Sequence, residues 1–141
     1  LPILNIPEIK ENKKSMSIVE KDILKEEVFA DPKLIKIVFH NLINNAIKYG
    51  FDNTDILISS NKDNNSLIYS VKNLGVGIDP NENESVFKKF TRLKQRGTEG
   101  VKGSGLGLFI CKEIMEKHKG SIWFDSKPGE WIEFNVSFPL P

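Results

Sequence analysis

The sequence predicts an α+β domain in which helices cover one face of a mixed, largely antiparallel sheet. Two segments, residues 31–49 and 106–117, show the periodicity of helices. Several short segments rich in β-branched and aromatic residues are typical of strands. In the last of these the apolar residues alternate with the others, so one sheet face is buried and the other is wet. Helices packed on such a sheet make a two-layer α/β sandwich.

Composition fits one compact domain. The chain has 141 residues, of which 39% are hydrophobic and 28% charged, with a net charge of +1. This supplies a core, and the small net charge gives no reason to expect a nucleic-acid partner. The single cysteine, Cys111, excludes an intrachain disulfide and favours a reducing, cytoplasmic location. No apolar run reaches the roughly 20 residues of a membrane span, which leaves open an anchor elsewhere in a parent protein.

In the N-terminal half, residues 1–14 are expected to be a tail or interdomain connector, and residues 15–141 the domain itself. Strands are predicted around residues 16–19 and 27–29. Asp31-Pro32 favours a helix start, because Asp caps free N–H groups and Pro fits the first turn. That helix should end near Gly50. Strands are then predicted over residues 56–60 and 67–72, joined by a polar turn.

In the C-terminal half, residues 75–105 are predicted to be mostly loop, with a short helical patch at residues 85–90. A loop of this length is usually functional, and here it would act as a lid. The second helix should run from about Leu106 to Lys117 and end at Gly120. A hairpin closes the domain, with strands over residues 122–124 and 131–138 around a Lys-Pro-Gly turn.

A polar stripe interrupts the otherwise apolar first helix. Asn41, Asn44, Asn45 and Lys48 recur at helical spacing along one narrow line. Asparagine is a poor helix former, and a buried amide without a partner is costly. The stripe is either a solvated face or a ligand site. In a ligand site, an amide oxygen would suit a hard cation and the ammonium a phosphate.

Two glycine clusters flank the long loop. One is the segment Asn73–Ile78, directly after a predicted strand, and the other is Gly103–Leu108, which opens the second helix. Each is either an ordinary turn or a place where backbone N–H groups approach an anion. Neither matches a Walker loop or a dinucleotide fingerprint. The basic residues between the clusters make either a solvated loop or a cover that carries positive charge to a triphosphate.

In order, these segments resemble the histidine kinase branch of the superfamily that includes DNA gyrase B, Hsp90 and MutL. The segment Asn41–Tyr49 resembles the N box, Asn73–Ile78 the first glycine box, Val86–Arg92 the F box, and Gly103–Leu108 the second glycine box. The resemblance covers residues 16–140. It implies a Bergerat-type sandwich with a mobile ATP lid, and a site that takes ATP with Mg²⁺.

The resemblance also implies roles for individual residues. Asn45 would be the Mg²⁺ ligand. The residues that would act on the phosphates or beside the metal are Asn41, Lys48 and Arg92. The remaining nucleotide-binding set is Tyr49, Asn73, Gly75, Gly77, Ile78, Phe90, Gly103, Ser104, Gly105, Leu106 and Gly107. Within it, Asn73 would face the adenine amino group. Phe87 and Phe90 would either contact the histidine-bearing helices or pin the lid to the core.

The resemblance leaves three possible activities: ATP hydrolysis, phosphoryl transfer to a protein, and nucleotide binding without catalysis. The gyrase and Hsp90 branch hydrolyses ATP with a glutamate four residues before the Mg²⁺-binding asparagine, whereas this chain has Asn41, which cannot act as a general base. That favours phosphoryl transfer, which needs mainly positioning and charge stabilisation. The alternative is a regulatory nucleotide-binding module with weak or lost kinase activity. It is supported by Asn73, where the family more often has aspartate.

The phosphoryl acceptor is expected to lie outside this chain. Neither His40 nor His118 has the sequence context of an acceptor histidine, and both are predicted to be structural or surface residues. The expected partners are a histidine-bearing dimerisation domain of the same parent protein and a downstream response regulator. The parent would be a homodimer and this fragment a monomer.

Overall fold

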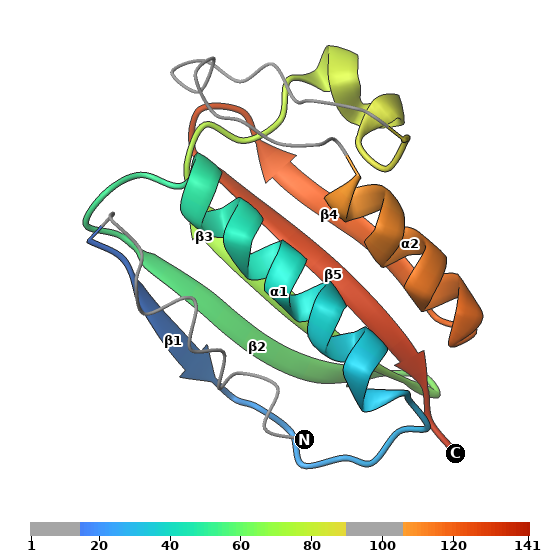
Figure 1. Ribbon diagram of the computed structural model, residues 1–141. Helices are drawn as coiled ribbons and strands as arrows, with labels where there is room; N and C mark the ends of the chain where they lie inside the picture. Colours follow the sequence, from blue (N-terminus) through green and yellow to red (C-terminus); the bar gives the residue numbers. More distant parts are fainter. Residues whose placement is uncertain (1–14, 90–105) are drawn as a thin grey trace.

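The computed structural model describes residues 15–89 and 106–141. It is a two-layer α+β sandwich, as predicted, in which two helices lie on one face of a five-stranded sheet (Figure 1). The strands are β1 (Ser17–Lys21), β2 (Asp55–Asp63), β3 (Ser66–Leu74), β4 (Ser121–Lys127) and β5 (Trp131–Pro139). The helices are α1 (Pro32–Tyr49) and α2 (Gly107–Lys117), with a short 3₁₀ turn, η2 (Pro80–Ser85).

The sheet has the strand order β1-β2-β3-β5-β4 and is mixed. The edge strand β1 runs parallel to β2, and every other neighbouring pair is antiparallel. The β2–β3 hairpin turns at Asn64, whose positive φ of 54° is one that asparagine tolerates better than most residues. This order places β3 at the centre of the sheet, with β2 and β5 on either side of it.

The helix α1 begins and ends where the sequence predicts. The Asp31 side chain accepts a hydrogen bond from the N–H of Lys33 at 2.9 Å, and Pro32 occupies the first helical position. Its buried side chains join those of the strands in one core, namely Ile35, Val38, Phe39, Leu42, Ile43 and Ala46. Within residues 15–89 and 106–141, no helix has the length and apolar character to cross a membrane.

His118 joins the end of α2 to the start of α1. Its Nε2 accepts a hydrogen bond from the N–H of Asp31 at 3.0 Å, and its Nδ1 lies 2.8 Å from the carbonyl oxygen of Ile114. The Asp31 bond requires an unprotonated Nε2, so Nδ1 carries the hydrogen and donates it to Ile114. The predicted structural role for His118 agrees with these contacts.

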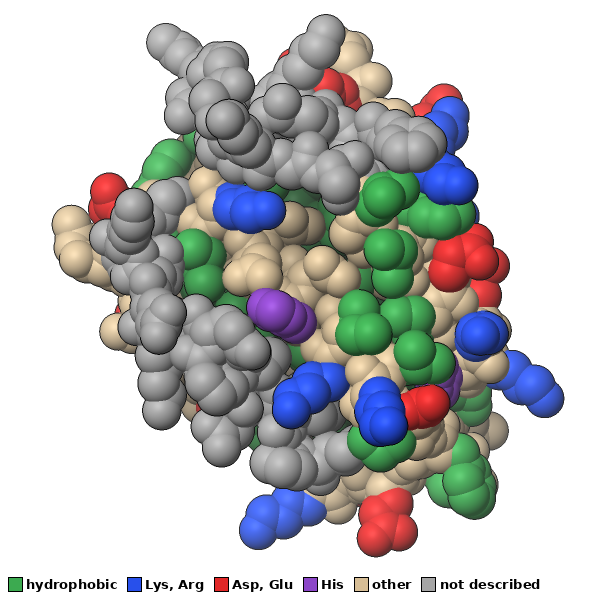
Figure 2. Space-filling model, in the orientation of Figure 1, with side chains coloured by type: hydrophobic (Ala, Val, Ile, Leu, Met, Phe, Trp, Pro, Cys, Tyr) green, Lys and Arg blue, Asp and Glu red, His purple; other side chains and the backbone are tan. Residues whose placement is uncertain are grey.

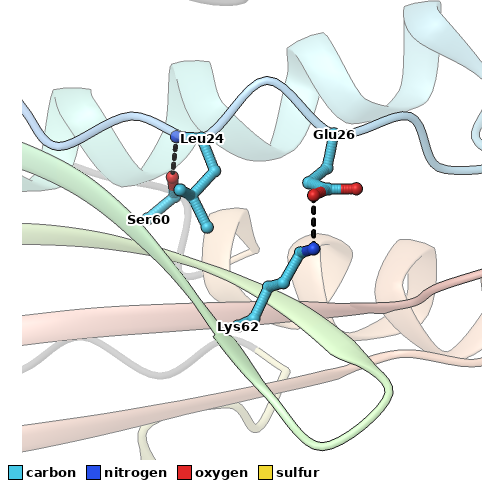
Figure 3. A network of polar contacts seen from close by, with 4 residues as sticks. All are labelled: Leu24, Glu26, Ser60 and Lys62. Atoms are coloured by element: carbon cyan, nitrogen blue, oxygen red, sulfur yellow. Dashed lines mark hydrogen bonds and ion pairs between the residues drawn. The ribbon is translucent and has the colours of Figure 1, made fainter.

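The strand predicted at residues 27–29 does not form. Phe29 is 84% exposed, so its aromatic ring has no sheet to pack on. Side-chain contacts hold the preceding segment against β2 instead (Figure 3). The N–H of Leu24 donates to Ser60 Oγ at 2.6 Å, and Glu26 forms an ion pair with Lys62.

The short helical patch also lies elsewhere than predicted. It is the 3₁₀ turn at Pro80–Ser85, while residues 86–89 form turns and bends. Asp79 caps it by accepting from the N–H of Asn81 at 2.9 Å, with Pro80 in the first position. The Asp-Pro pair that opens α1 therefore opens this element too, and the sequence prediction used that signal only once.

Candidate functional site

The polar stripe lies at the border of the α1 core face. Asn41, Asn44 and Asn45 are half-buried and Lys48 is exposed, while Leu42, Ile43 and Ala46 between them are buried. The stripe thus flanks the packed face of the helix. Its amides are neither fully solvated nor enclosed, which is the placement expected of side chains that border a ligand site.

Asn41 contacts the first turns of α2. A Cβ added to Gly107 would lie 3.1 Å from Asn41 Oδ1, so the glycine allows close approach of the two helices at this point. The Asn41 side chain also hydrogen-bonds to the buried thiol of Cys111, and the thiol lies 3.7 Å from the carbonyl oxygen of Val38. Burial raises the pKa of Cys111 to about 12, so the thiol stays protonated at neutral pH.

The end of β3 meets the end of α1 through two glycines. Gly50 and Gly75 pair in an antiparallel bridge. A Cβ on Gly75 would lie 2.4 Å from the carbonyl oxygen of Tyr49 and 2.8 Å from Asn73 Nδ2, so no larger residue fits. Three residues from two sequence motifs, Tyr49, Asn73 and Gly75, are therefore neighbours.

Asn73 is the one buried side chain in the described residues with an orphaned polar atom. Its side chain is 3% exposed, and its Nδ2 has no hydrogen-bond partner there. Such a group is costly unless something else pairs with it. This is an indication, from geometry alone, that a polar ligand or water belongs beside residue 73.

The first glycine segment is fixed to the β4–β5 turn by Ser126. Gly77 has a φ of +68°, and a Cβ there would lie 2.8 Å from Ser126 Oγ. The same oxygen accepts from the N–H of Ile78 at 3.0 Å and donates to the carbonyl oxygen of Trp131 at 3.1 Å. Sequence reasoning missed Ser126, because a serine in an alternating strand carries no signal of its own.

The predicted site residues that the structure describes converge on one end of the molecule. They lie on the C-terminal half of α1, at the end of β3 with the glycines after it, and at the start of α2, where Leu106 and Gly107 stand (Figure 1). The predicted residues outside the described part are Phe90, Arg92, Gly103, Ser104 and Gly105. The lid prediction rests mainly on that part of the chain.

Phe87 packs into the core. Its ring centroid lies 6.1 Å from that of Phe124 and 6.2 Å from that of Phe134. These ring contacts are the ones expected if Phe87 pins its segment to the core. Beyond it, Lys89 Nζ lies 5.6 Å from the centroid of Phe109, which joins this segment to the first turn of α2.

The helix-covered face is partly apolar. Figure 2 shows hydrophobic side chains gathered over α2, on the same face as α1. Among the described helix residues, the large apolar side chains more than a third exposed are Ile37 and Ile110. They stand on different helices, so each helix leaves one sizeable apolar side chain uncovered.

Comparison with known proteins identifies the family. The profile of the histidine kinase-, DNA gyrase B- and HSP90-like ATPases matches residues 30–141. The chain is 41% identical over 114 residues to the phytochrome-like protein Cph1 of Synechocystis, covering 80% of this chain and 15% of Cph1. It is 34% identical over 142 residues to the adaptive-response sensory kinase SasA of Synechocystis, covering 98% of this chain and 36% of SasA.

A solved structure supports the same assignment. The catalytic domain of histidine kinase ThkA superposes with a TM-score of 0.74 at 31% identity, covering 95% of this chain and 86% of that one. The chain therefore belongs to the histidine kinase-, DNA gyrase B- and HSP90-like ATPase family, and within it resembles the catalytic domains of sensor histidine kinases. It spans well under half the length of either curated relative.

Proposed function

We propose that this domain binds ATP with Mg²⁺ and donates the γ-phosphoryl group to a histidine on a separate dimerisation domain of its parent protein. The observation that carries the proposal is the convergence, at one end of the fold, of the α1 amide stripe, the orphaned amide of Asn73 and the glycine that opens α2. Phosphoryl transfer needs mainly positioning and charge stabilisation, and these groups can supply both. A domain that uses ATP in this way would lie on the cytoplasmic side.

The residues suit a metal that arrives with the nucleotide. Mg²⁺ in phosphate sites is typically held by one or two protein oxygens, with phosphates and waters completing its shell. The described residues contain no group of three or more His, Cys, Asp or Glu that could hold a metal by themselves. The half-buried amide of Asn45 offers one neutral oxygen, which fits this arrangement. When bound, the metal would neutralise charge on the phosphates.

The chain's own groups divide the remaining work. Lys48 would contact a phosphate, and Gly107 would present backbone at the N-terminus of α2, where the helix dipole favours an anion. Tyr49 would line the base pocket beside Asn73. Arg92 would reach the terminal phosphate from the lid.

Asn41 argues against ATP hydrolysis as the main activity. It stands four residues before Asn45, and its amide cannot take a proton from water. Its contacts with Cys111 and Gly107 hold it against α2 instead. A response regulator downstream of the phosphohistidine completes the proposed pathway.

The test is binding followed by transfer. The fragment is titrated with ATP, with Mg²⁺ or with chelator, and is then mixed with its own separately supplied histidine domain. Asn45→Ala should weaken binding in Mg²⁺ by about tenfold and leave the metal-free affinity nearly unchanged, because only the metal contact is lost. Asn61→Ala, the same substitution at an exposed position of β2 away from the site, is the control and should change neither.

The outcomes separate the candidate activities. Binding with transfer supports the kinase. Binding without transfer identifies a regulatory module, the reading that the substitution of Asn73 for aspartate favours. An Asn45→Ala effect equal in Mg²⁺ and chelator would mean that Asn45 acts structurally.

A further inference from the structure

The buried amide of Asn73 differs from the other buried asparagine of the sheet. Asn135, 4% exposed, is fixed by its neighbours. In the orientation that satisfies both its ends, it donates to Ser70 Oγ at 2.6 Å and Glu133 Oε1 at 3.3 Å, and accepts from Trp123 Nε1 at 3.2 Å. The amide of Asn135 therefore has one favoured orientation.

Asn73 has no such restraint. No described residue pairs with its Nδ2, so no hydrogen bond at that nitrogen opposes an exchange of the two ends of the amide. Its surroundings are backbone and apolar groups. Nδ2 would lie 2.8 Å from a Cβ on Gly75 and 3.4 Å from one on Gly50, and the latter Cβ would also lie 2.6 Å from Met16 Cε. Nδ2 forms a hydrogen bond with none of these neighbours, nor with the carbonyl oxygens of Tyr49 and Ala46 beside the same two glycines.

The surroundings favour a heterocycle over a phosphate as the group beside residue 73. Among the described site residues, the features suited to phosphate are the cationic side chain of Lys48 and the N-terminus of α2 at Gly107. Asn73 lies instead where β3 ends against Tyr49 and Gly50. A flat ring with a polar edge is the chemistry that fits a neutral amide among backbone and apolar groups.

We propose that Asn73 allows the site to take 6-oxopurine nucleotides as well as adenine nucleotides; this rests on the proposed function. Adenine presents an amino group as a donor, and guanine presents O6 as an acceptor at the same ring position. An amide can meet the first through its oxygen and the second, after exchange of its ends, through its nitrogen. An aspartate can only accept, and its charge repels O6.

The experiment titrates ADP, GDP and inosine diphosphate into the wild-type domain in the presence of Mg²⁺. Inosine diphosphate carries the 6-oxo group without the 2-amino group, so it isolates the contact at issue. The expected result is that both 6-oxo nucleotides bind within about tenfold of ADP. If ADP binds and both 6-oxo nucleotides are weaker by about a thousandfold or more, the inference is wrong and the proposed function stands.

Two substitutions test whether residue 73 sets the preference between ADP and GDP. Asn73→Asp should widen the preference for ADP over GDP by at least about tenfold, since the acceptor-only carboxylate loses the guanine contact. Asn61→Asp makes the same chemical change on an exposed residue of β2 and should leave the ratio unchanged. An unchanged ratio in a folded Asn73→Asp domain would overturn the inference.

Asn73→Leu keeps the branched shape of the side chain and removes both hydrogen-bonding ends. It should weaken ADP and GDP by similar factors of about tenfold. If it alters neither affinity, residue 73 does not contact the base. If the wild-type domain binds none of the three nucleotides, both the inference and the proposed function fail, and that result is distinct from selective rejection of the 6-oxo purines.

Discussion

Asn41 shows how one side chain couples the two helices beneath the proposed nucleotide site. Its amide lies against Gly107 and hydrogen-bonds to the thiol of Cys111. Cys111 is fully buried and also reaches back to the carbonyl oxygen of Val38, one turn before Asn41 on α1. The orientation of Asn41 therefore depends on a residue of α2 that no nucleotide would touch.

The buried thiol should make stability fall in alkaline solution. The pKa of Cys111 rises from its ordinary value of 9.0 to about 12, because burial disfavours the thiolate. Between these values the unfolded chain loses this proton and the folded chain keeps it. The contribution of the thiol to stability is therefore complete below pH 9.0 and is lost as pH rises toward 12. The slope from this group is roughly 1.4 kcal/mol per pH unit.

Other groups titrate in the same window, so the measurement compares wild type with Cys111→Ala. Urea unfolding at about pH 8 should show the wild type more stable, because the alanine leaves a gap in the core. By about pH 10.5 that advantage should shrink by roughly 2 kcal/mol. An advantage that stays constant with pH would show that the thiolate is tolerated in the folded state.

The uncovered face of the sheet carries a charge cluster that spans three strands. Glu133 on β5 lies in register with Lys72 on β3 and with Asp125 on β4. Lys72 Nζ also lies 4.6 Å from the ring centroid of Trp131. Burial, more than any neighbour, raises the pKa of Glu133; Lys72 opposes the rise and Asp125 adds to it.

Replacing Glu133 with glutamine should stabilise the domain at neutral pH. A carboxyl group whose pKa is raised on folding contributes its full stability below its unfolded pKa, and that contribution is lost as pH rises through the folded pKa. Burial therefore penalises the ionised form of Glu133, and Glu133→Gln removes that penalty. In urea unfolding the variant should exceed wild type at about pH 7 and lose that advantage at about pH 3.

The matched control is Glu130→Gln in the same hairpin. Glu130 is exposed and forms an ion pair with Lys127 at 2.9 Å. Losing an exposed pair costs at most about 1 kcal/mol, so this variant should be slightly less stable than wild type at neutral pH. Destabilisation by Glu133→Gln to the same extent would mean that Lys72 outweighs burial.

Whether a segment forms a helix or a strand was predictable where a local sequence feature, such as a capping residue or an alternating pattern, agreed with the packing of the fold. The Asp-Pro start of α1 and the alternation of β5 each have a mechanism in the chain itself, and both elements formed. The strand predicted at residues 27–29 failed because β propensity stabilises nothing without a neighbouring strand, and Phe29 has none.

The residues that would contact a ligand were predictable from the sequence, but the residues that hold them in position were not. The amide stripe and the glycines stand out in sequence because their residue types are unusual in a buried helix or a strand end. Ser126 and Cys111 are ordinary residues in ordinary elements. Their roles arise from which strand turn or helix they meet, and that is set by the whole fold.

In the whole molecule, His118, which joins α2 to the start of α1, lies at the opposite end of α2 from the proposed phosphate site. His118 caps the C-terminus of α2, while the proposed site includes the N-terminus of the same helix (Figure 1). Eleven residues of α-helix span about 16 Å. Both ring nitrogens of His118 are also engaged, one with Asp31 and one with Ile114.

The fragment should therefore bind ATP without labelling itself. Phosphorylating His118 would require breaking one of its two hydrogen bonds about 16 Å along the helix from the proposed phosphates. His40 is half-buried on α1, five residues before Asn45 on the same helix, and lies outside the stripe assigned to the metal and phosphates. Incubation with γ-labelled ATP and Mg²⁺ should leave the chain unlabelled until the separate histidine domain is added.

The variants His40→Gln and His118→Ala test each histidine separately as an internal acceptor. Acid-labile phosphate on the wild-type chain that disappears in either variant would identify an internal acceptor and contradict an acceptor outside this domain.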